Sequence, residues 1–470
     1  MGEILSKSID ENSKLLKKKL RVDENFDVIY RELDAGGRRI GFFFIDGFCK
    51  DDLMQKLLQY LIGLKPEDIP DNIDEFSEKC MPHVEVDILY DAESVVSNVL
   101  MGVTCFLVDG IEGSVALDTR TYPMRSVDEP WKDRVLRGSR DGFVETIVMN
   151  TALIRRRIRD ERLRVEMTNV GTRSKTDIAI VYLEDKVDKT FLKNLKKRID
   201  NIKVESLTMN IESFAECLLD AKYINPFPKF KFTERPDTAA SAIYEGNIII
   251  IVDNAPSAII LPTSVFDILE EADDYYFPPV IGIYLKMSRY LLTFVSFALT
   301  PFWLVLIKNP SMVPDWLSFV LITDEITVPV ILQLLMLEIG IDGLKLAAVN
   351  TPSMLSTPLS IVAGIVVGEY AVSSGWFNSE ALLYMAIVTV ANYGQASFEF
   401  GYALKIMRII TLILTWFIGI WGFLAGTALL VLSICFNKTL SGKSYIYPIF
   451  PFNGRKLVRK LFRIRLPHEN

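Results

Sequence analysis

Several acidic residues stand inside long apolar stretches in the second half of this chain. They are Asp324, Glu325, Glu338, Asp342, Glu369 and Glu399. A charge inside a bilayer is costly, so such residues usually face the interior of a helix bundle or water. Rings of carboxylates concentrate cations and repel anions. The pattern indicates a cation path, with Glu325, Glu338 and Glu369 as pore or gate candidates.

The same acids also have a plainer interpretation, in which they lie at the membrane surface or form ion pairs. Asp342 is three residues before Lys345, a spacing at which side chains meet on a helix, so we discount Asp342 as a pore residue. Pro329 lies between Glu325 and Glu338 and would kink or break a helix there. The candidate partners for such ion pairs are Lys345, Lys405 and Arg408.

Small and polar residues interrupt the apolar stretches. Gly364 and Gly368 are four residues apart in GIVVGEY, a spacing that lets helices approach closely, so we expect helix packing there. The triplets at 350–352 (Asn-Thr-Pro) and 392–394 (Asn-Tyr-Gly) place polar backbone inside two segments. Such breaks are tolerated in membranes where they line cavities, which fits a channel and equally a transporter.

A run of five arginines falls within residues 155–162 (RRRIRDER). The first 286 residues carry 39 basic and 50 acidic side chains, a net charge of −11, and no aromatic side chains interleave the arginines. Both facts argue against nucleic acid as a partner. The run is either a solvated helix face paired with local acids or a contact surface. We expect Arg155, Arg156 and Arg159 to contact a neighbouring subunit or anionic lipid.

No catalytic or metal-binding constellation is visible in the sequence. The five cysteines are widely spaced and the chain has two histidines, so neither a disulfide framework nor a zinc site is expected. Glycine-rich nucleotide-binding motifs are absent. The sequence predicts a protein that is not an enzyme and that needs no cofactor or metal.

The first half has the pattern of an α/β protein. The apolar run at 39–48 ends in Asp46-Gly47 and predicts a strand and turn, and leucines at helical spacing predict a helix over 50–64. A helical pattern covers 144–160. Apolar strands flank a turn at Asp253-Asn254, and the helix before them is expected to stop at Gly246.

The second half has the pattern of a membrane domain. From residue 287 onward five segments are long and apolar enough to be considered as spans of a bilayer about 30 Å thick. They are 287–307, 316–344, 357–376, 379–398 and 406–436. The expected fold is therefore an α/β cytosolic region of two small subdomains followed by an α-helical multipass transmembrane domain.

The basic tail sets the expected topology. Residues 438–470 carry eight basic residues and one acid, which places them in the cytosol. The N-terminus has no apolar run of signal-peptide length, so the α/β region is expected there too. Two cytosolic ends require an even number of crossings. We therefore take 316–344 as a segment that dips into the bilayer or lies along it. The alternative is five or six crossings, with the last segment split near Gly419 and Gly422.

These patterns give six expected regions. They are a charged mobile arm (1–24), a first α/β subdomain (25–122), a linker (123–137), a second α/β subdomain (138–280), a transmembrane helical domain (281–437) and a basic cytosolic tail (438–470).

Three long stretches resemble a known family. They begin RGSRDGFVETIVMNTALIRRRIRD, YINPFPKFKFTERPDTAASAIYEG and LSIVAGIVVGEYAV. They are similar to the A subunits of spore germinant receptors, the GerA family of endospore-forming bacteria, over about residues 130–440. The earlier stretches ENFDVIYRELDAGGRRIGFFFIDGF and CMPHVEVDI look most like the stage V sporulation protein AF branch.

The resemblance implies a multipass protein of the spore inner membrane that assembles as a ring-shaped homo-oligomer. Its pore would release monovalent cations during germination. The AF branch implies amplification of that release, together with a small membrane partner and other germination receptor proteins. The residues alone leave three functions open: an oligomeric cation channel, a secondary transporter, or a non-conducting scaffold for germination proteins.

Overall fold

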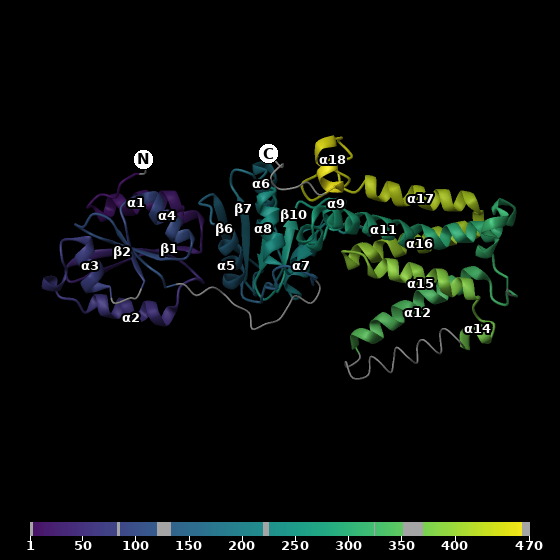
Figure 1. Cartoon of the computed structure of the whole chain (residues 1–470), viewed down its shortest axis with the longest axis horizontal. Coiled ribbons are helices and arrows are strands. Elements are labelled where there is room, and N and C mark those ends of the chain that lie inside the picture. The colour runs from purple at the N-terminus through teal and green to yellow at the C-terminus, as the bar shows by residue number, and fades with distance from the viewer. Residues whose placement is uncertain are drawn as a thin grey trace. The chain divides into compact units, whose positions relative to one another are not determined.

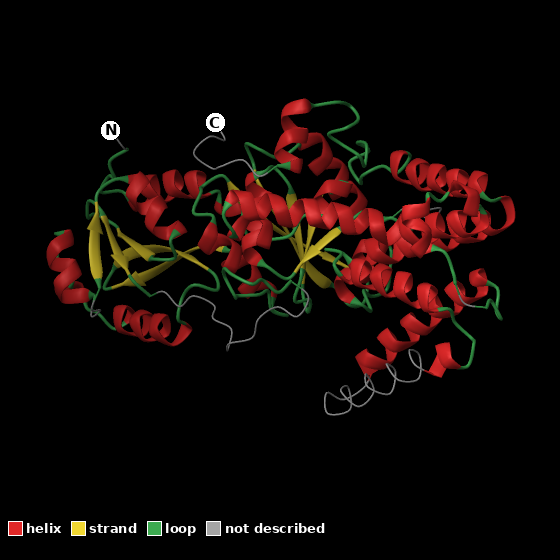
Figure 2. Cartoon of the chain, turned by 45° about the vertical axis from the view of Figure 1, so that its right-hand side comes forward, coloured by secondary structure: helices red, strands yellow, loops and turns green. Residues whose placement is uncertain are grey.

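The chain divides into two compact units, which are described one at a time. The computed structural model describes residues 3–81, 85–119, 133–219, 225–323, 325–350 and 370–462, without the side chains of 349 and 350. The α/β unit comprises residues 1–221 and 230–262, and the helical unit comprises 222–229 and 263–470 (Figure 1). The strands belong to the α/β unit (Figure 2).

The first half of the α/β unit is an antiparallel sheet with helices on both faces. Its strand order is β1-β2-β4-β5-β3. The strands are β1 (Val28–Ala35), β2 (Arg38–Ile45), β3 (Val86–Leu89), β4 (Thr104–Val108) and β5 (Ser114–Leu117). The helices are α1 (Ile9–Leu20), α2 (Asp51–Ile62), α3 (Ile73–Cys80) and α4 (Ala92–Leu100).

Alternation along the strands supplies a core on each face of this sheet. Phe43 of β2 lies in the core under α1 and α4. Its neighbour Phe42 lies in the opposite core, with α2 and α3. This alternation of inward and outward side chains is what a pleated strand dictates. The expected strand at 39–48 and helix at 50–64 are both present.

The expected mobile arm at 1–24 contributes residues 5–20 to this core. Leu5, Ile9, Leu16 and Leu20 are buried with at most 1% of their surface exposed. Ser8 caps the helix by accepting from the Glu11 amide. The many lysines of α1 obscured the apolar face, because they occupy the solvent side of an amphipathic helix.

The second half of the α/β unit repeats the same arrangement. Its strand order is β6-β7-β9-β10-β8, again antiparallel. The strands are β6 (Leu163–Val170), β7 (Thr176–Leu183), β8 (Lys231–Thr233), β9 (Ile248–Val252) and β10 (Ala258–Leu261). The helices are α5 (Ile147–Arg157), α6 (Lys189–Asp200), α7 (Asn210–Leu218) and α8 (Pro236–Tyr244). The predicted stop at Gly246 is present, with φ +94°.

The expected boundary near residue 280 lies too late in the chain. Residues 263–280 belong to the helical unit, because Val265 and Phe266 pack in one cluster with Phe297 and Phe400. The expected linker at 123–137 lies outside the described residues up to 132. Asp133 is described, and its carboxylate accepts from the Thr233 hydroxyl at 2.8 Å.

The described elements of the helical unit are helices. Their bounds are α9 (Val265–Ile268), α10 (Asp273–Tyr276), α11 (Pro279–Lys308), α12 (Val330–Asn350), α14 (Ala371–Ser373), α15 (Ser379–Tyr393), α16 (Phe398–Ile418), α17 (Ile420–Cys435) and α18 (Gly454–Leu461). Within the described ranges, α11 and α16 are long and apolar enough to cross a membrane, and α17 is a shorter apolar helix.

Two expected segments divide into separate elements. Residues 316–344 contain a 3-10 turn, a loop and then α12, which begins directly after Pro329. The last apolar segment breaks at Gly419, whose φ of +66° suits glycine, so the predicted split near Gly419 and Gly422 is confirmed. A Cβ on Gly422 would lie 2.0 Å from the Leu414 carbonyl oxygen, so α17 packs closely on α16.

Candidate functional site

A buried ion cluster joins three helices of the helical unit. Glu338 of α12 and Arg408 of α16 each leave 2% of their side chains exposed. Arg408 donates from Nε and Nη2 to the two oxygens of Glu338, at 2.6 and 2.9 Å. Arg408 also donates from Nη1 to the carbonyl of Ser296 on α11. Such a bidentate pair fixes the geometry of both side chains.

A second pair extends the cluster by one helical turn. Lys405 Nζ lies 3.2 Å from Glu338 Oε2 and 2.5 Å from Asp342 Oδ2. It also donates to the Glu338 carbonyl at 2.9 Å. Glu338 and Asp342 are four apart on α12, and Lys405 and Arg408 are three apart on α16. These spacings put each pair on one helix face.

Glu338 therefore forms ion pairs, as in the plainer interpretation of these acids, and it also lies inside the helix bundle. Its carboxylate is neutralised by two cations. Asp342, which the sequence assigned to Lys345, pairs with Lys405 instead, because α16 lies beside α12. Lys345 lies with its Nζ 4.6 Å from the centre of the Tyr393 ring. The pairing with α16 could not be read from local spacing.

Polar atoms without partners lie on the same helices. Among the described residues, the buried side-chain atoms Ser296 Oγ, Thr300 Oγ1 and Asp342 Oδ1 have no hydrogen-bond partner. An unpaired polar atom in an apolar interior costs about 1–3 kcal/mol. The apolar bundle thus holds charge and unused hydrogen-bonding capacity together.

Glu325 is not brought to this cluster. It lies in the loop before α12 and its side chain is exposed. Its backbone carbonyl accepts from Asn378 at 3.4 Å, and Asn378 in turn is held by Gln333. Glu325 therefore lies on an exposed loop, whereas Glu338 is buried on α12. The two carboxylates do not form one site. Glu369, Gly364, Gly368 and Asp324 lie outside the described residues.

The arginine run lies at the junction between the two subdomains of the α/β unit. Arg155 is fully buried and donates from Nε and Nη2 to the Asp27 carboxylate at 3.1 and 3.0 Å. This corrects the expected role of Arg155, since a side chain enclosed by its own chain cannot reach lipid or another subunit. Helix α5 ends at Arg157, so Arg159 follows the helix. Arg156 and Arg159 are exposed, and their contact role stays a prediction.

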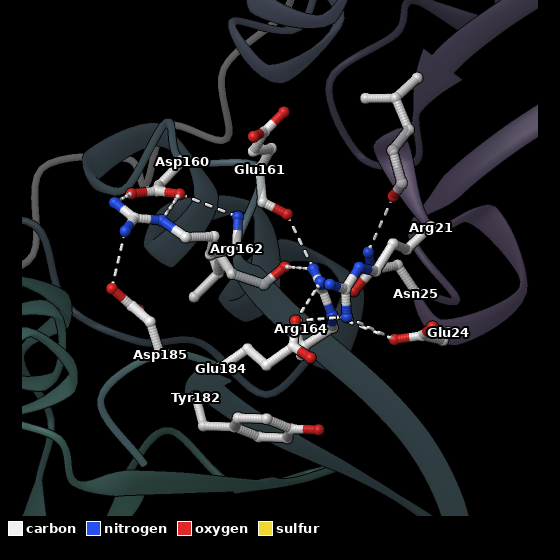
Figure 3. A network of polar contacts seen from close by, with 12 residues as sticks. Arg21, Glu24, Asn25, Asp160, Glu161, Arg162, Arg164, Tyr182, Glu184 and Asp185 are labelled. Carbon is white, nitrogen blue, oxygen red and sulfur yellow. Dashed lines mark hydrogen bonds and ion pairs between the residues drawn. The ribbon is translucent and has the colours of Figure 1, made fainter. Parts of the chain in front are cut away.

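A second part of this junction is drawn in Figure 3. Arg164 pairs with Glu184 at 2.5 Å and with Glu24 at 3.2 Å. Arg21 also pairs with Glu184, and its hydrogen bond, assisted by the charge of Arg164, lowers the pKa of Glu184 below its ordinary 4.5. The Asn25 side chain accepts from the Val165 amide at 2.8 Å. These contacts join the segment after α1 to strand β6.

Within the described ranges, no three His, Cys, Asp or Glu side chains gather in a way that could hold a metal ion. The buried cluster instead pairs its two carboxylates with a lysine and an arginine.

Comparison with known proteins identifies relatives along nearly the whole chain. The family model described as Bacillus/Clostridium GerA spore germination protein matches residues 14–470. Stage V sporulation protein AF of Bacillus subtilis is 35% identical over 97% of this chain and 92% of its own length. Spore germination protein KA of the same organism is 26% identical over 98% of this chain and 85% of its own.

A solved structure of a related domain is also similar. It is the N-terminal domain of the A subunit of the Bacillus megaterium spore germinant receptor GerK3, which matches 55% of this chain and 96% of its own at 25% identity and a TM-score of 0.44. The family match and the 35% identical relative together show that this chain belongs to the GerA family of spore germination proteins.

Proposed function

We propose that the chain forms an oligomeric cation-conducting channel in the spore inner membrane. It would release monovalent cations, or amplify their release, during germination. The observation that supports this most is the buried cluster of Glu338, Lys405 and Arg408 inside an apolar bundle. The role is non-catalytic.

The surface of the helical unit supports membrane insertion. Large apolar side chains point outward from α11, α16 and α17, including Phe294 (67% exposed), Phe417 (79%) and Trp421 (70%). A soluble surface rarely exposes contiguous apolar area of this kind, so these faces fit lipid or neighbouring subunits. The same faces are available for a homo-oligomeric ring.

The cluster supports a gating role. Two carboxylates and two cations neutralise each other, and Asp342 keeps one oxygen without a partner among the described residues. A passing cation could coordinate the Asp342 and Glu338 oxygens only if Lys405 moved away from them. We propose that this exchange is the gate, and that Glu325 and Glu369 belong to the remaining path.

The names of the relatives support protein partners that also act in spore germination. Several are spore germination proteins, so association with other germination receptor proteins is proposed, together with a small membrane partner. The α/β unit and the tail are proposed to lie in the cytosol. A cysteine at Met209, which is 70% exposed, should react with a membrane-impermeant thiol reagent only after the membrane is opened.

Cation flux tests the proposal. The full chain is reconstituted in potassium-loaded vesicles, and release is compared for wild type, Glu338→Gln and Glu325→Gln. We expect each variant to reduce flux roughly tenfold, a barrier difference of about 1.4 kcal/mol. Glu212→Gln, an exposed site of the α/β unit, is the matched control and should release potassium as wild type does.

Two results would count against the channel. Vesicles with correctly inserted wild-type protein and no flux would favour the scaffold. Unchanged flux and selectivity in Glu338→Gln would place the path away from the cluster. Because Glu338→Gln leaves Arg408 unpaired and could reduce protein yield, Asp342→Asn provides a milder second variant at a side chain that is 34% exposed.

A further inference from the structure

The last described helix has an outward face that mixes basic and apolar side chains. Arg455, Lys456 and Arg459 of α18 are exposed. Beside them on the helix surface lie Val458, 49% exposed, and Phe462, 43% exposed. Residues three and four apart are neighbours on a helix, so Arg455, Arg459, Val458 and Phe462 form one continuous strip.

The loop before α18 adds exposed apolar side chains. Ile449, Phe450 and Phe452 are 48%, 68% and 76% exposed. Asn453 then caps α18 by accepting from the Lys456 amide at 3.1 Å. A capped, basic helix directly after exposed aromatic residues has the composition of a segment that lies in a membrane interface.

The inner side of α18 is fixed to the helical unit. Leu457 and Leu461 pack against the core cluster that contains Phe297 and Phe400. Lys460 lies 2.7 Å from Asp267 of α9 and 3.4 Å from Glu270. These contacts determine which side of α18 turns outward, so its exposed face is a property of the folded unit.

The position of α18 along the apolar helices is also fixed. Tyr290, near the start of the apolar part of α11, donates its hydroxyl to the Lys460 carbonyl at 3.5 Å. The same cluster takes Phe400 from the first turn of α16 and Ile434 from the last turn of α17. The beginning of α16 and the end of α17 therefore lie at the level of α18, where the apolar part of α11 also begins. In a membrane, that level is the headgroup region.

We propose that α18 and the loop at 449–452 form a docking surface for anionic phospholipid. Arg455, Lys456 and Arg459 bind the lipid phosphates, while Phe450 and Phe452 enter the boundary between headgroups and acyl chains. Basic residues near an anionic leaflet each contribute about a fivefold preference for the bound state. This proposal rests on the membrane insertion proposed above and does not depend on conduction.

The charge pattern favours lipid over a protein partner. A bilayer offers negative headgroups beside apolar chains over an extended plane, which matches the alternation of arginine and phenylalanine on this face. The apolar side chains of the loop precede the basic ones of α18, and Val458 and Phe462 lie beside them. The proposed surface thus tethers the end of the helical unit to the leaflet.

Lipid quenching tests this surface in the full chain. The native cysteines are replaced by alanine, Val458→Cys carries an environment-sensitive fluorophore, and the protein is reconstituted in vesicles of phosphatidylcholine with or without phosphatidylglycerol. Lipids with a quencher on the upper acyl chain report contact. We expect stronger quenching with phosphatidylglycerol, reduced by salt. The triple variant Arg455→Gln, Lys456→Gln, Arg459→Gln should abolish that lipid dependence.

A matched control removes the same charge elsewhere. Lys189, Lys193 and Lys197 are exposed on α6 of the α/β unit, and changing all three to Gln should leave the quenching unchanged. Equal quenching in both lipids, or loss of quenching in the control, overturns the proposal. A shielded but unquenched fluorophore that responds to protein density means that a second copy covers the face, which also overturns it. Failure of the chain to enter vesicles counts against membrane insertion itself.

Discussion

The two subdomains of the α/β unit share more than their topology. In each, the order is a helix, a hairpin, two helices, a strand, a helix and a second hairpin. The carboxylate of Asp109 accepts from the first amide of α1, that of Ile9, at 3.2 Å. In the second subdomain, Asp253 accepts from the first amide of α5, that of Ile147, also at 3.2 Å. The two subdomains are therefore called the first and second copy of one arrangement.

A second polar contact repeats in the same way. Asn12 of α1 accepts from the Ser6 amide at 2.9 Å and donates to the Ser6 carbonyl. Asn150 of α5 accepts from the Val144 amide at 2.8 Å and donates to the Val144 carbonyl. Both copies therefore use one amide side chain to fasten the chain entering the first helix.

The copies differ at the position eight residues after the start of that helix. In the first it is Lys17, whose Nζ lies 4.0 Å from the centre of the Tyr30 ring. In the second it is Arg155, buried against Asp27 of the first copy. The contacts that hold the backbone are the same, whereas this position in the second copy joins the two subdomains. The comparison explains one member of the arginine run, Arg155, as the residue that joins the two subdomains.

The largest expected effect comes from deleting the first helix. A fragment of residues 1–262 should unfold cooperatively in denaturant, as each subdomain has its own core. A fragment of residues 25–262 lacks α1 and should lose the part of that transition that comes from the first subdomain, since burying each leucine or isoleucine contributes about 1.5–3 kcal/mol. Circular dichroism during denaturant titration measures both. A transition of undiminished amplitude in the shorter fragment would mean that the first subdomain folds without α1.

Next comes the contact that distinguishes the copies. Asp27→Ala leaves Arg155 buried without its partner and should lower the free energy of unfolding of the 1–262 fragment by about 3–5 kcal/mol. Lys17→Ala, the matched change in the first copy, should cost less than about 1 kcal/mol. In Asp27→Ala, the further change Arg155→Met should recover part of the loss. Equal costs at Lys17 and Asp27 would contradict the assignment of Arg155 to the junction.

The sequence predicted much of the second copy and less of the first. The strands and helices expected at 144–160 and around Asp253 are present, because long apolar runs dominate there. Helix α1 was missed because lysines mask its apolar face. A signal for it was available: SIDENSKLLKKKL at 8–20 matches TIVMNTALIRRRI at 146–158 in the placing of its polar, apolar and basic residues. The basic runs of the two segments are the same element in two copies.

The ion cluster could be anticipated only in part. Glu338 and its possible partners were visible as charges in apolar segments, but the choice of Arg408 and Lys405 depends on how α12 packs on α16. Nor does local spacing reveal that Arg155 reaches Asp27, which lies 128 residues earlier. Long-range pairing follows from the tertiary fold, and single-sequence periodicity does not contain it.

A smaller effect tests the repeated asparagine. Asn12→Ala and Asn150→Ala each remove a buried amide that satisfies one backbone donor and one backbone acceptor. Each should cost about 1–3 kcal/mol in the free energy of unfolding of the 1–262 fragment. Similar losses in the two variants would support equivalent roles. A loss in only one of the two variants would mean that the same contacts do not stabilise the two copies equally.

The smallest effect concerns the turn after the capping aspartate. Gly110 has φ +85° and donates its amide to the Lys7 carbonyl at 2.8 Å, and Asn254 has φ +61° and donates to the Glu145 carbonyl at the same distance. Both residue types tolerate this left-handed backbone. Gly110→Asn should therefore cost less than about 1 kcal/mol, since no heavy atom lies within 4 Å of a Cβ built there.

The reciprocal change, Asn254→Gly, should cost only a few tenths of a kcal/mol, roughly the entropy that glycine adds to the unfolded chain. Gly110→Val is the contrast, because a β-branched residue is strained at positive φ and should cost clearly more than Gly110→Asn. Denaturant titration of the three variants in the 1–262 fragment ranks them. If Gly110→Asn proved as costly as Gly110→Val, the backbone at 110 would need glycine alone, and the two turns would not be interchangeable.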